Sequence, residues 1–125
     1  MKVKTKVLET VQVSDGEYME MSEMIMKFAG DFISMGESIE ERQKYLDSAC
    51  VAWNSSLLPL KEQKRAIKEY LKDYKKNNYN LDEEDCKEIQ ENIENLILEK
   101  ERLFPDEDSQ IFSAEIEIKD GIENY

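Results

Sequence analysis

Residues 61–76 contain seven of the chain's 17 basic residues, at a spacing that a helix gathers on one side. At about 100° per residue, the seven project into a single arc of about 120°. The segment therefore predicts an amphipathic helix that buries an apolar side and exposes a basic one. We call the seven residues the basic stripe. They are Lys61, Lys64, Arg65, Lys68, Lys72, Lys75 and Lys76.

The segment that follows the basic stripe has the opposite charge. Residues 58–80 hold seven positive and three negative side chains, a net of +4, whereas residues 81–125 hold four positive and sixteen negative, a net of −12. Projected on a helix, the acids of the later segment lie away from its apolar residues. We call five of them the acidic face: Glu84, Asp85, Glu88, Glu91 and Glu94. Neighbouring segments of opposite charge imply a polarised surface and a charged partner.

Apolar residues at helical spacing predict four helices in all, over 22–36, 38–57, 59–77 and 82–104. Ser38 and Glu41 match a capping box at the start of the second helix. The buried sides are expected to include Trp53 in the second helix and Leu60 in the third. The acids that open the fourth helix stabilise the positive end of its dipole, and Lys100 near its other end complements the negative end.

Alternating residues predict a short terminal β element, with strands near 3–13 and 111–118. Asp-Gly pairs at 15–16 and 120–121 are turn signals that could each close a hairpin. Residues 1–20 form either this strand or a loosely attached tail. We expect one domain over 1–125, because this length suits a single core. The fold class is α+β and predominantly helical, with about four helices in a small bundle.

The absence of histidine removes much of the enzyme repertoire. It excludes a Ser-His-Asp triad, a Cys-His dyad and His-ligated zinc, and the four scattered glycines form no phosphate-binding loop. The run Asp106–Asp108 fails as a calcium loop because Ile111 stands where that loop needs glycine. We therefore expect a chain that is not an enzyme, with no catalytic residue, no metal and no cofactor. A carboxylate-dependent metal enzyme ranks last among the alternatives.

Targeting signals are missing from the sequence. No apolar run approaches the roughly 20 residues that span a bilayer, and no apolar stretch follows the first lysines as a secretory signal requires. Cys50 and Cys86 occur at helix-core spacing and read as small core residues. These features predict a reduced, cytoplasmic chain with no membrane contact.

The basic stripe has three explanations. It is a solvated face in which Glu62–Arg65, Glu69–Lys72 and Asp73–Lys76 pair, or a surface for a protein partner, or a nucleic-acid contact. The sixteen acids that follow it count against nucleic acid, because they repel a polyanion. A protein partner includes a second copy of the chain, whose acidic face would meet the stripe. Trp53 lies in a nearly uncharged stretch and is read first as a core residue and second as an interface hot spot.

The leading functional hypothesis is a small acidic protein that binds and regulates another protein through charged helical faces. Bacterial immunity proteins, antitoxins and anti-defence inhibitors are short and acidic in the same way, and the comparison is by class alone. A nucleic-acid accessory protein that uses the basic stripe is the alternative. The sequence leaves the identity of the partner and the oligomeric state open.

Overall fold

The computed structural model describes residues 2–7, 12–13, 17–18, 21–77 and 81–117. Its helices are α1 (Met21–Ser34), α2 (Ile39–Ser56), α3 (Leu60–Asn77) and α4 (Glu83–Leu103). Its strands are β1 (Lys2–Val7), β2 (Gln12–Val13), β3 (Glu17–Tyr18) and β4 (Ile111–Glu117). The prediction of a predominantly helical α+β fold is confirmed. Each helix begins and ends within a residue or two of its predicted bounds.

Local chemistry explains where the helices begin. Ser38 caps α2 by accepting a hydrogen bond from the Glu41 N–H at 3.1 Å, although the return bond from Glu41 does not form. The complete capping box lies instead at α4, where Asp82 accepts from the Asp85 N–H at 2.8 Å and Asp85 accepts from the Asp82 N–H at 3.3 Å. The acids that open α4 therefore act through specific hydrogen bonds as well as through the dipole.

The turn between α1 and α2 depends on Gly36. A Cβ atom built there would lie 2.8 Å from the backbone nitrogen of Arg42, so any larger residue would push the first turn of α2 away. Arg42 also donates a hydrogen bond from Nε to the Gly36 carbonyl at 3.0 Å. Gly36 therefore allows the start of α2 to lie directly against the turn that follows α1.

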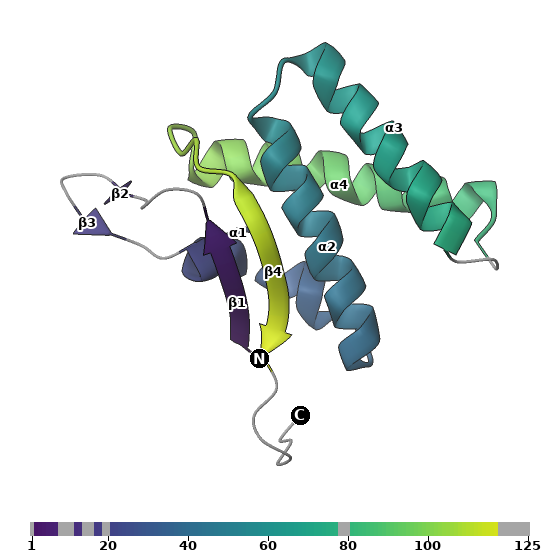
Figure 1. Ribbon diagram of the computed structural model, residues 1–125, viewed down its shortest axis with the longest axis horizontal. Coiled ribbons are helices and arrows are strands. Elements are labelled where there is room, and N and C mark those ends of the chain that lie inside the picture. The colour runs from purple at the N-terminus through teal and green to yellow at the C-terminus, as the bar shows by residue number, and fades with distance from the viewer. Residues whose placement is uncertain (1, 8–11, 14–16, 19–20, 78–80, 118–125) are drawn as a thin grey trace.

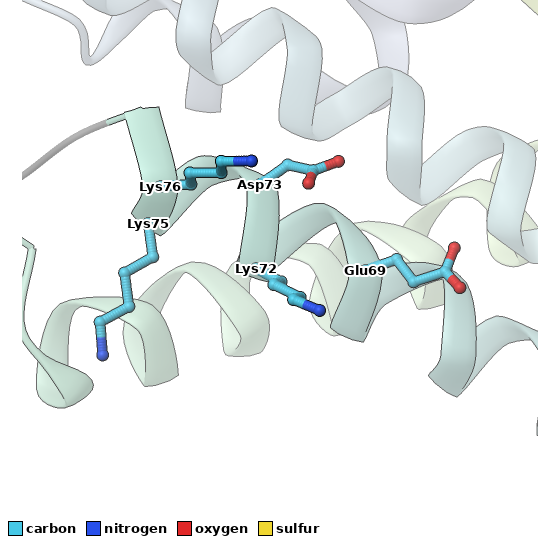
Figure 2. Close-up of a pocket in the computed structure, with 5 residues that line it drawn as sticks. All are labelled: Glu69, Lys72, Asp73, Lys75 and Lys76. Atoms are coloured by element: carbon cyan, nitrogen blue, oxygen red, sulfur yellow. The ribbon is translucent and has the colours of Figure 1, made fainter.

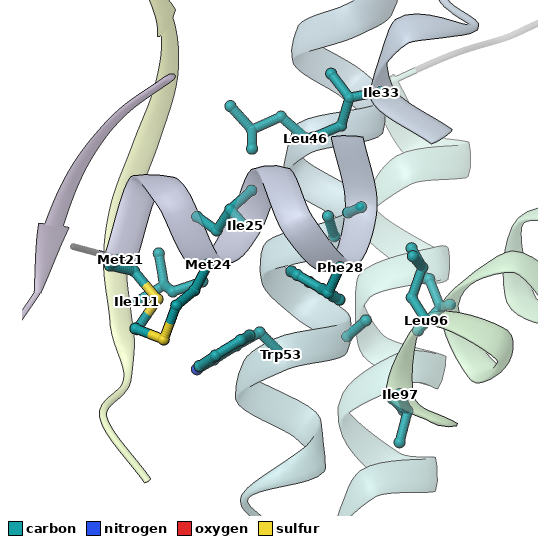
Figure 3. Packing of buried hydrophobic residues seen from close by; sticks show 14 of the residues in the cluster. Met21, Met24, Ile25, Phe28, Ile33, Leu46, Trp53, Leu96, Ile97 and Ile111 are labelled. Carbon is teal, nitrogen blue, oxygen red and sulfur yellow. The ribbon is translucent and has the colours of Figure 1, made fainter. Parts of the chain in front are cut away.

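Helix α2 lies at the centre of the molecule, packed against α1, α3, α4 and β4 (Figure 1). Its Trp53 is fully buried, with the Phe28 ring edge-on at 5.3 Å and the Phe104 ring at 5.9 Å between centroids. Figure 3 shows the α1 side chains Met24 and Phe28 on one side of that indole. Burying an aromatic residue of this size is the largest single apolar contribution to such a core.

Helix α3 contributes much less to the core. Ile67 is its one fully buried residue, at 5% exposure, while Tyr70, Leu71 and Tyr74 are half-buried. Leu60 was expected on the buried side, and that expectation is wrong: the side chain is 66% exposed at the first position of the helix. The first turn of α3 extends beyond the elements it packs on, so Leu60 has no apolar surface to cover.

The strand pairing expected on either side of residues 15–16 is present between β2 and β3, whereas the single strand expected near 3–13 is divided in two. Residues near 3–13 divide into β1 and β2, and β1 pairs antiparallel with the distant β4, while β2 pairs with β3. The register sets Lys2 opposite Glu117 and Lys4 opposite Glu115. The turn predicted at 15–16, the turn at 120–121 and the return strand at 122–125 lie outside the described residues.

The second edge of β4 faces α2, where two side-chain amides replace a neighbouring strand. Asn54 donates to the Ile111 carbonyl at 2.9 Å and accepts from the Ile111 N–H at 2.8 Å. Gln43 donates to the Ala114 carbonyl at 3.1 Å and accepts from the Ile116 N–H at 2.9 Å. Each amide thus satisfies one outward donor and one outward acceptor of an edge strand, groups that are costly when left unpaired.

Replacing Asn54 with alanine tests this arrangement. We expect Asn54→Ala to lower the free energy of unfolding by about 2–4 kcal/mol, because the N–H and C=O of the buried Ile111 both lose their partner. Urea denaturation measures the change. Asn95→Ala is the matched control, since Asn95 is exposed on α4 and its loss should change stability by less than about 0.5 kcal/mol. Equal effects of the two substitutions would contradict the role of Asn54.

Candidate protein-interaction face

The basic stripe lies on the outer surface of α3. All seven of its side chains are exposed, and they follow α3 over about 22 Å at 1.5 Å per residue. The apolar side of the helix, around Ile67 and Tyr70, turns toward the core and leaves the stripe facing away from it. The amphipathic helix predicted from the spacing of these residues is therefore present.

Within α3, the acids do not neutralise the stripe. The expected pairs Glu62–Arg65, Glu69–Lys72 and Asp73–Lys76 do not form, whereas Arg102 and Glu99 on α4 do form an ion pair between described residues. Glu62, Glu69 and Asp73 project to one flank of the stripe, roughly 60° or more from its centre. The three expected pairs are therefore absent, while the exposed, solvated character of the stripe is present.

The acidic face lies on α4, next to α3. Four of its members, Glu84, Glu88, Glu91 and Glu94, are exposed. The fifth, Asp85, is half-buried and accepts the Asp82 N–H hydrogen bond in the capping box, so its carboxylate already has a structural role. The exposed part of the acidic face is thus the row from Glu84 to Glu94.

A groove between α3 and α4 is lined by two residues of the basic stripe and one residue of the acidic face. It has a volume of about 510 Å³, and the residues that line it are Lys64, Ile67, Lys68, Leu71, Gln90 and Glu94. Lys64 and Lys68 form the wall on α3 and Glu94 belongs to the wall on α4, while Ile67 and Leu71 supply an apolar floor. We call this feature the α3–α4 groove. No ion pair crosses it between described residues.

A second hollow, of about 660 Å³, surrounds the end of α3. It is lined by side chains of both signs from the last turns of α3: Glu69, Lys72, Asp73, Lys75 and Lys76. Figure 2 shows these side chains pointing in different directions from one helix, with no second element closing over them. All five of these described residues are charged, so none of them supplies an apolar floor to the hollow.

Trp53, the second candidate contact residue, has no exposed surface. Its Nε1 donates to the Ser109 carbonyl at 2.8 Å, and the Lys100 ammonium lies 5.1 Å from the centre of its ring. An indole in this position contacts the core and the loop before β4, and it presents nothing to a partner. The hot-spot interpretation of Trp53 is therefore replaced by a structural one.

Lys100 is the residue whose environment the sequence did not reveal. It was expected to complement the end of the α4 dipole, but it is only 3% exposed and donates to the Glu107 carbonyl at 2.6 Å. Burial lowers the pKa of this lysine, against the opposing effect of Glu107. Its position in the apolar seam of α4, between Leu96 and Leu103, was the available signal. Its role is to hold the loop that leads into β4.

The two cysteines are free thiols, both half-buried. Burial raises the pKa of Cys50 to about 12, with Asp47 acting in the same direction, so this sulfur stays protonated near neutral pH. A protonated thiol is a poor nucleophile. Cys50 therefore has no activated chemistry in the described fold.

The described residues form neither a metal-binding cluster nor a membrane-spanning helix. No group of three or more Cys, Asp and Glu side chains in these ranges gathers closely enough to hold a metal ion. In the same part of the chain, no helix combines the length and apolar character needed to cross a bilayer. Comparisons of the chain with protein-family models, curated protein sequences and solved structures gave no match.

Tyr70 and Tyr74 stand close to the stripe in sequence but turn toward the core. The Tyr70 hydroxyl lies 2.9 Å from Ser48 Oγ on α2, and the rings of Tyr70 and Tyr74 lie 5.8 Å apart. Burial raises the pKa of Tyr70 to about 12, with the Ser48 hydrogen bond acting in the other direction. A base could not stack on the Tyr70 ring without displacing it from α2.

The pKa of Tyr70 can be tested through stability. In the unfolded chain this phenol loses its proton near its ordinary pKa of 10.0, whereas in the fold it keeps the proton until about 12. The folded state therefore binds the proton more tightly in this window, and the free energy of unfolding should fall as pH rises from 10 to 12. In Tyr70→Phe the fall should be smaller, as measured by urea denaturation at successive pH values. An identical alkaline loss in both proteins would show that Tyr70 is not the titrating group.

Proposed function

We propose that this chain is a small, non-enzymatic, cytoplasmic protein that binds and regulates another protein through the basic stripe and the acidic face. One observation carries the proposal. The seven basic side chains are all exposed, with no ion-pair partner among the described residues, on a helix with a single fully buried side chain. The packing of the core does not require these charges. We therefore attribute them to the binding of a partner.

The stripe has a cost within the chain itself. Like charges stand four residues apart at 61 and 65, 64 and 68, 68 and 72, and 72 and 76. Such pairs destabilise a helix by about 0.2–0.5 kcal/mol each, so the four together cost about 1–2 kcal/mol. The negative remainder of the chain offsets part of this repulsion. A partner whose carboxylates approach the stripe would remove the rest, which is the physical reason to expect one.

The apposition of opposite charges narrows the kind of partner. A partner whose surface carries charge of a single sign would be attracted to one wall of the α3–α4 groove and repelled by the other. A partner whose surface carries both positive and negative charges could be attracted to both walls. Protein surfaces offer such mixed patterns at fixed spacing. Immunity proteins, antitoxins and anti-defence inhibitors act by this kind of stoichiometric contact, and we assign the chain to that functional class by analogy.

Affinity capture from native lysate at low salt tests the proposal. We expect the wild-type chain to retain one protein at a fixed stoichiometry, and Lys68→Glu to reduce that retention at least about tenfold, because it reverses a charge at the centre of the face. Lys27→Glu is the matched control: it changes the net charge equally, but on the exposed side of α1. The proposal fails if no protein is retained, or if both variants retain it equally.

Nucleic-acid binding is the second candidate, and one observation favours it. The stripe forms an exposed row about 22 Å long, which suits contacts with successive phosphates. If this were its role, wild-type binding to single- and double-stranded DNA and RNA would weaken steeply with salt. The triple change of Lys64, Lys68 and Lys72 to glutamate would abolish it. Fluorescence anisotropy on labelled oligonucleotides measures both effects, and absence of wild-type binding eliminates this candidate.

A further inference from the structure

The α3–α4 groove has a pattern of charge that is complementary to itself. One wall carries Lys64 and Lys68, the opposite wall carries Glu94, and the apolar residues Ile67 and Leu71 lie between them. A two-fold axis that runs along the groove, in the plane of contact, places the basic wall of each copy over the acidic wall of the other. Both copies then gain attraction on both sides, which is the condition for an isologous interface.

We propose that the α3–α4 groove is the self-association surface of this chain, and that its occupant is the same groove of a second copy. The inference rests on the proposed function, because it names one partner for the same face. A second copy is always present at the concentration of the chain itself. It also supplies both signs of charge, one for each wall of the groove, which a partner of a single sign does not. Self-association and binding of another protein then compete for the groove.

An exposed leucine adds an apolar contact to this pairing. Leu98 lies one turn beyond Glu94 on α4 and is 64% exposed, one of three large apolar side chains so exposed among the described residues. In the two-fold arrangement the α4 wall of one copy, which carries Leu98, lies over the α3 wall of the other, beside the apolar floor of Ile67 and Leu71. A well-packed apolar residue inside a charged rim is the usual anatomy of an interface.

Net charge opposes the dimer, and this opposition predicts an unusual salt dependence. Each copy carries −12, so two copies repel at long range. The Debye length falls from about 30 Å at 0.01 M salt to about 8 Å at 0.15 M and about 3 Å at 1 M. Moderate salt therefore screens the long-range repulsion before it screens the close pairs across the interface. Association should be strongest near 0.15 M and weaker at both extremes.

Charge reversal in two separate proteins gives the decisive experiment. Sedimentation equilibrium on the wild-type chain, from about 1 µM to about 1 mM, should show a reversible dimer. Lys68→Glu alone should sediment as a monomer, because each introduced glutamate then faces Glu94 of the other copy. Glu94→Lys alone should do the same, because each introduced lysine then faces Lys68. Either reversal is expected to weaken association by about tenfold or more, since two contacts change from attraction to repulsion.

Mixing the two variants at equal concentration should restore the dimer. In the mixed pair, the glutamate introduced at position 68 of one copy faces the lysine introduced at position 94 of the other. The second contact joins the unchanged Glu94 of the first copy to the unchanged Lys68 of the second. A dimer mass for the mixture, with each variant monomeric alone, supports the proposal.

Two further variants separate the contributions of net charge and of apolar contact. Lys27→Glu is the control for net charge and should dimerise as the wild type does. Leu98→Ser should weaken the dimer without changing the salt dependence. Circular dichroism confirms that each variant is folded.

Three results would overturn the proposal: a monomeric wild type over the whole concentration range, a dimer that neither reversal weakens, or a mixture no more associated than its components. Each leaves the proposed function separately measurable. If the wild type is monomeric but Lys68→Glu still loses its captured protein, self-association fails and the proposed function stands. If the wild type is monomeric and nothing is captured, both fail.

Discussion

The fold depends on how the C-terminal strand β4 is bound to α2. A strand edge needs partners for its outward N–H and C=O groups, and in this chain a helix provides them through Gln43 and Asn54. The two amides are eleven residues apart, about 16 Å along a helix, and the peptide groups they bind span about 13 Å along a strand. The lengths match closely enough for both to bind at once. Few pairs of amide positions on α2 would satisfy this condition.

The same helix packs against most of the other elements. With β4 on one side and α1, α3 and α4 on the others, α2 contacts four elements, and its Trp53 is fully buried in the core. The same tryptophan binds the loop before β4 through Ser109, and Lys100 binds that loop through Glu107. Helix α3 then has only an outer position. Because α3 buries only one side chain fully, packing constrains few of its residues. The other residues of α3 can therefore be determined by a function other than packing.

The sequence predicted what local chemistry decides and missed what distant segments decide. Helix bounds follow from caps and breaks within a few residues, so all four were found, and the exposed side of α3 followed from periodicity alone. The pairing of β1 with β4 joins two distant parts of the chain, and the sequence of neither strand indicates which strand it pairs with. Lys100 has a charged side chain, which is typical of the protein surface, but it occupies a position in the apolar seam of α4. Its burial follows from that position and not from its residue type.

The groove could be predicted only in part, because it depends on the angle between two helices as well as on their faces. The sequence placed positive charge on one helix and negative charge on the next. The apolar floor at Ile67 and Leu71 appears only when α3 and α4 are packed with those residues at their common edge. The same apposition argues against a polyanion. A phosphate bound at Lys68 would lie in the same groove as Glu94, whose carboxylate would repel it. A surface with both signs of charge would be attracted to both walls, and for this reason the partner we propose is a protein with a charge pattern like that of α3 and α4.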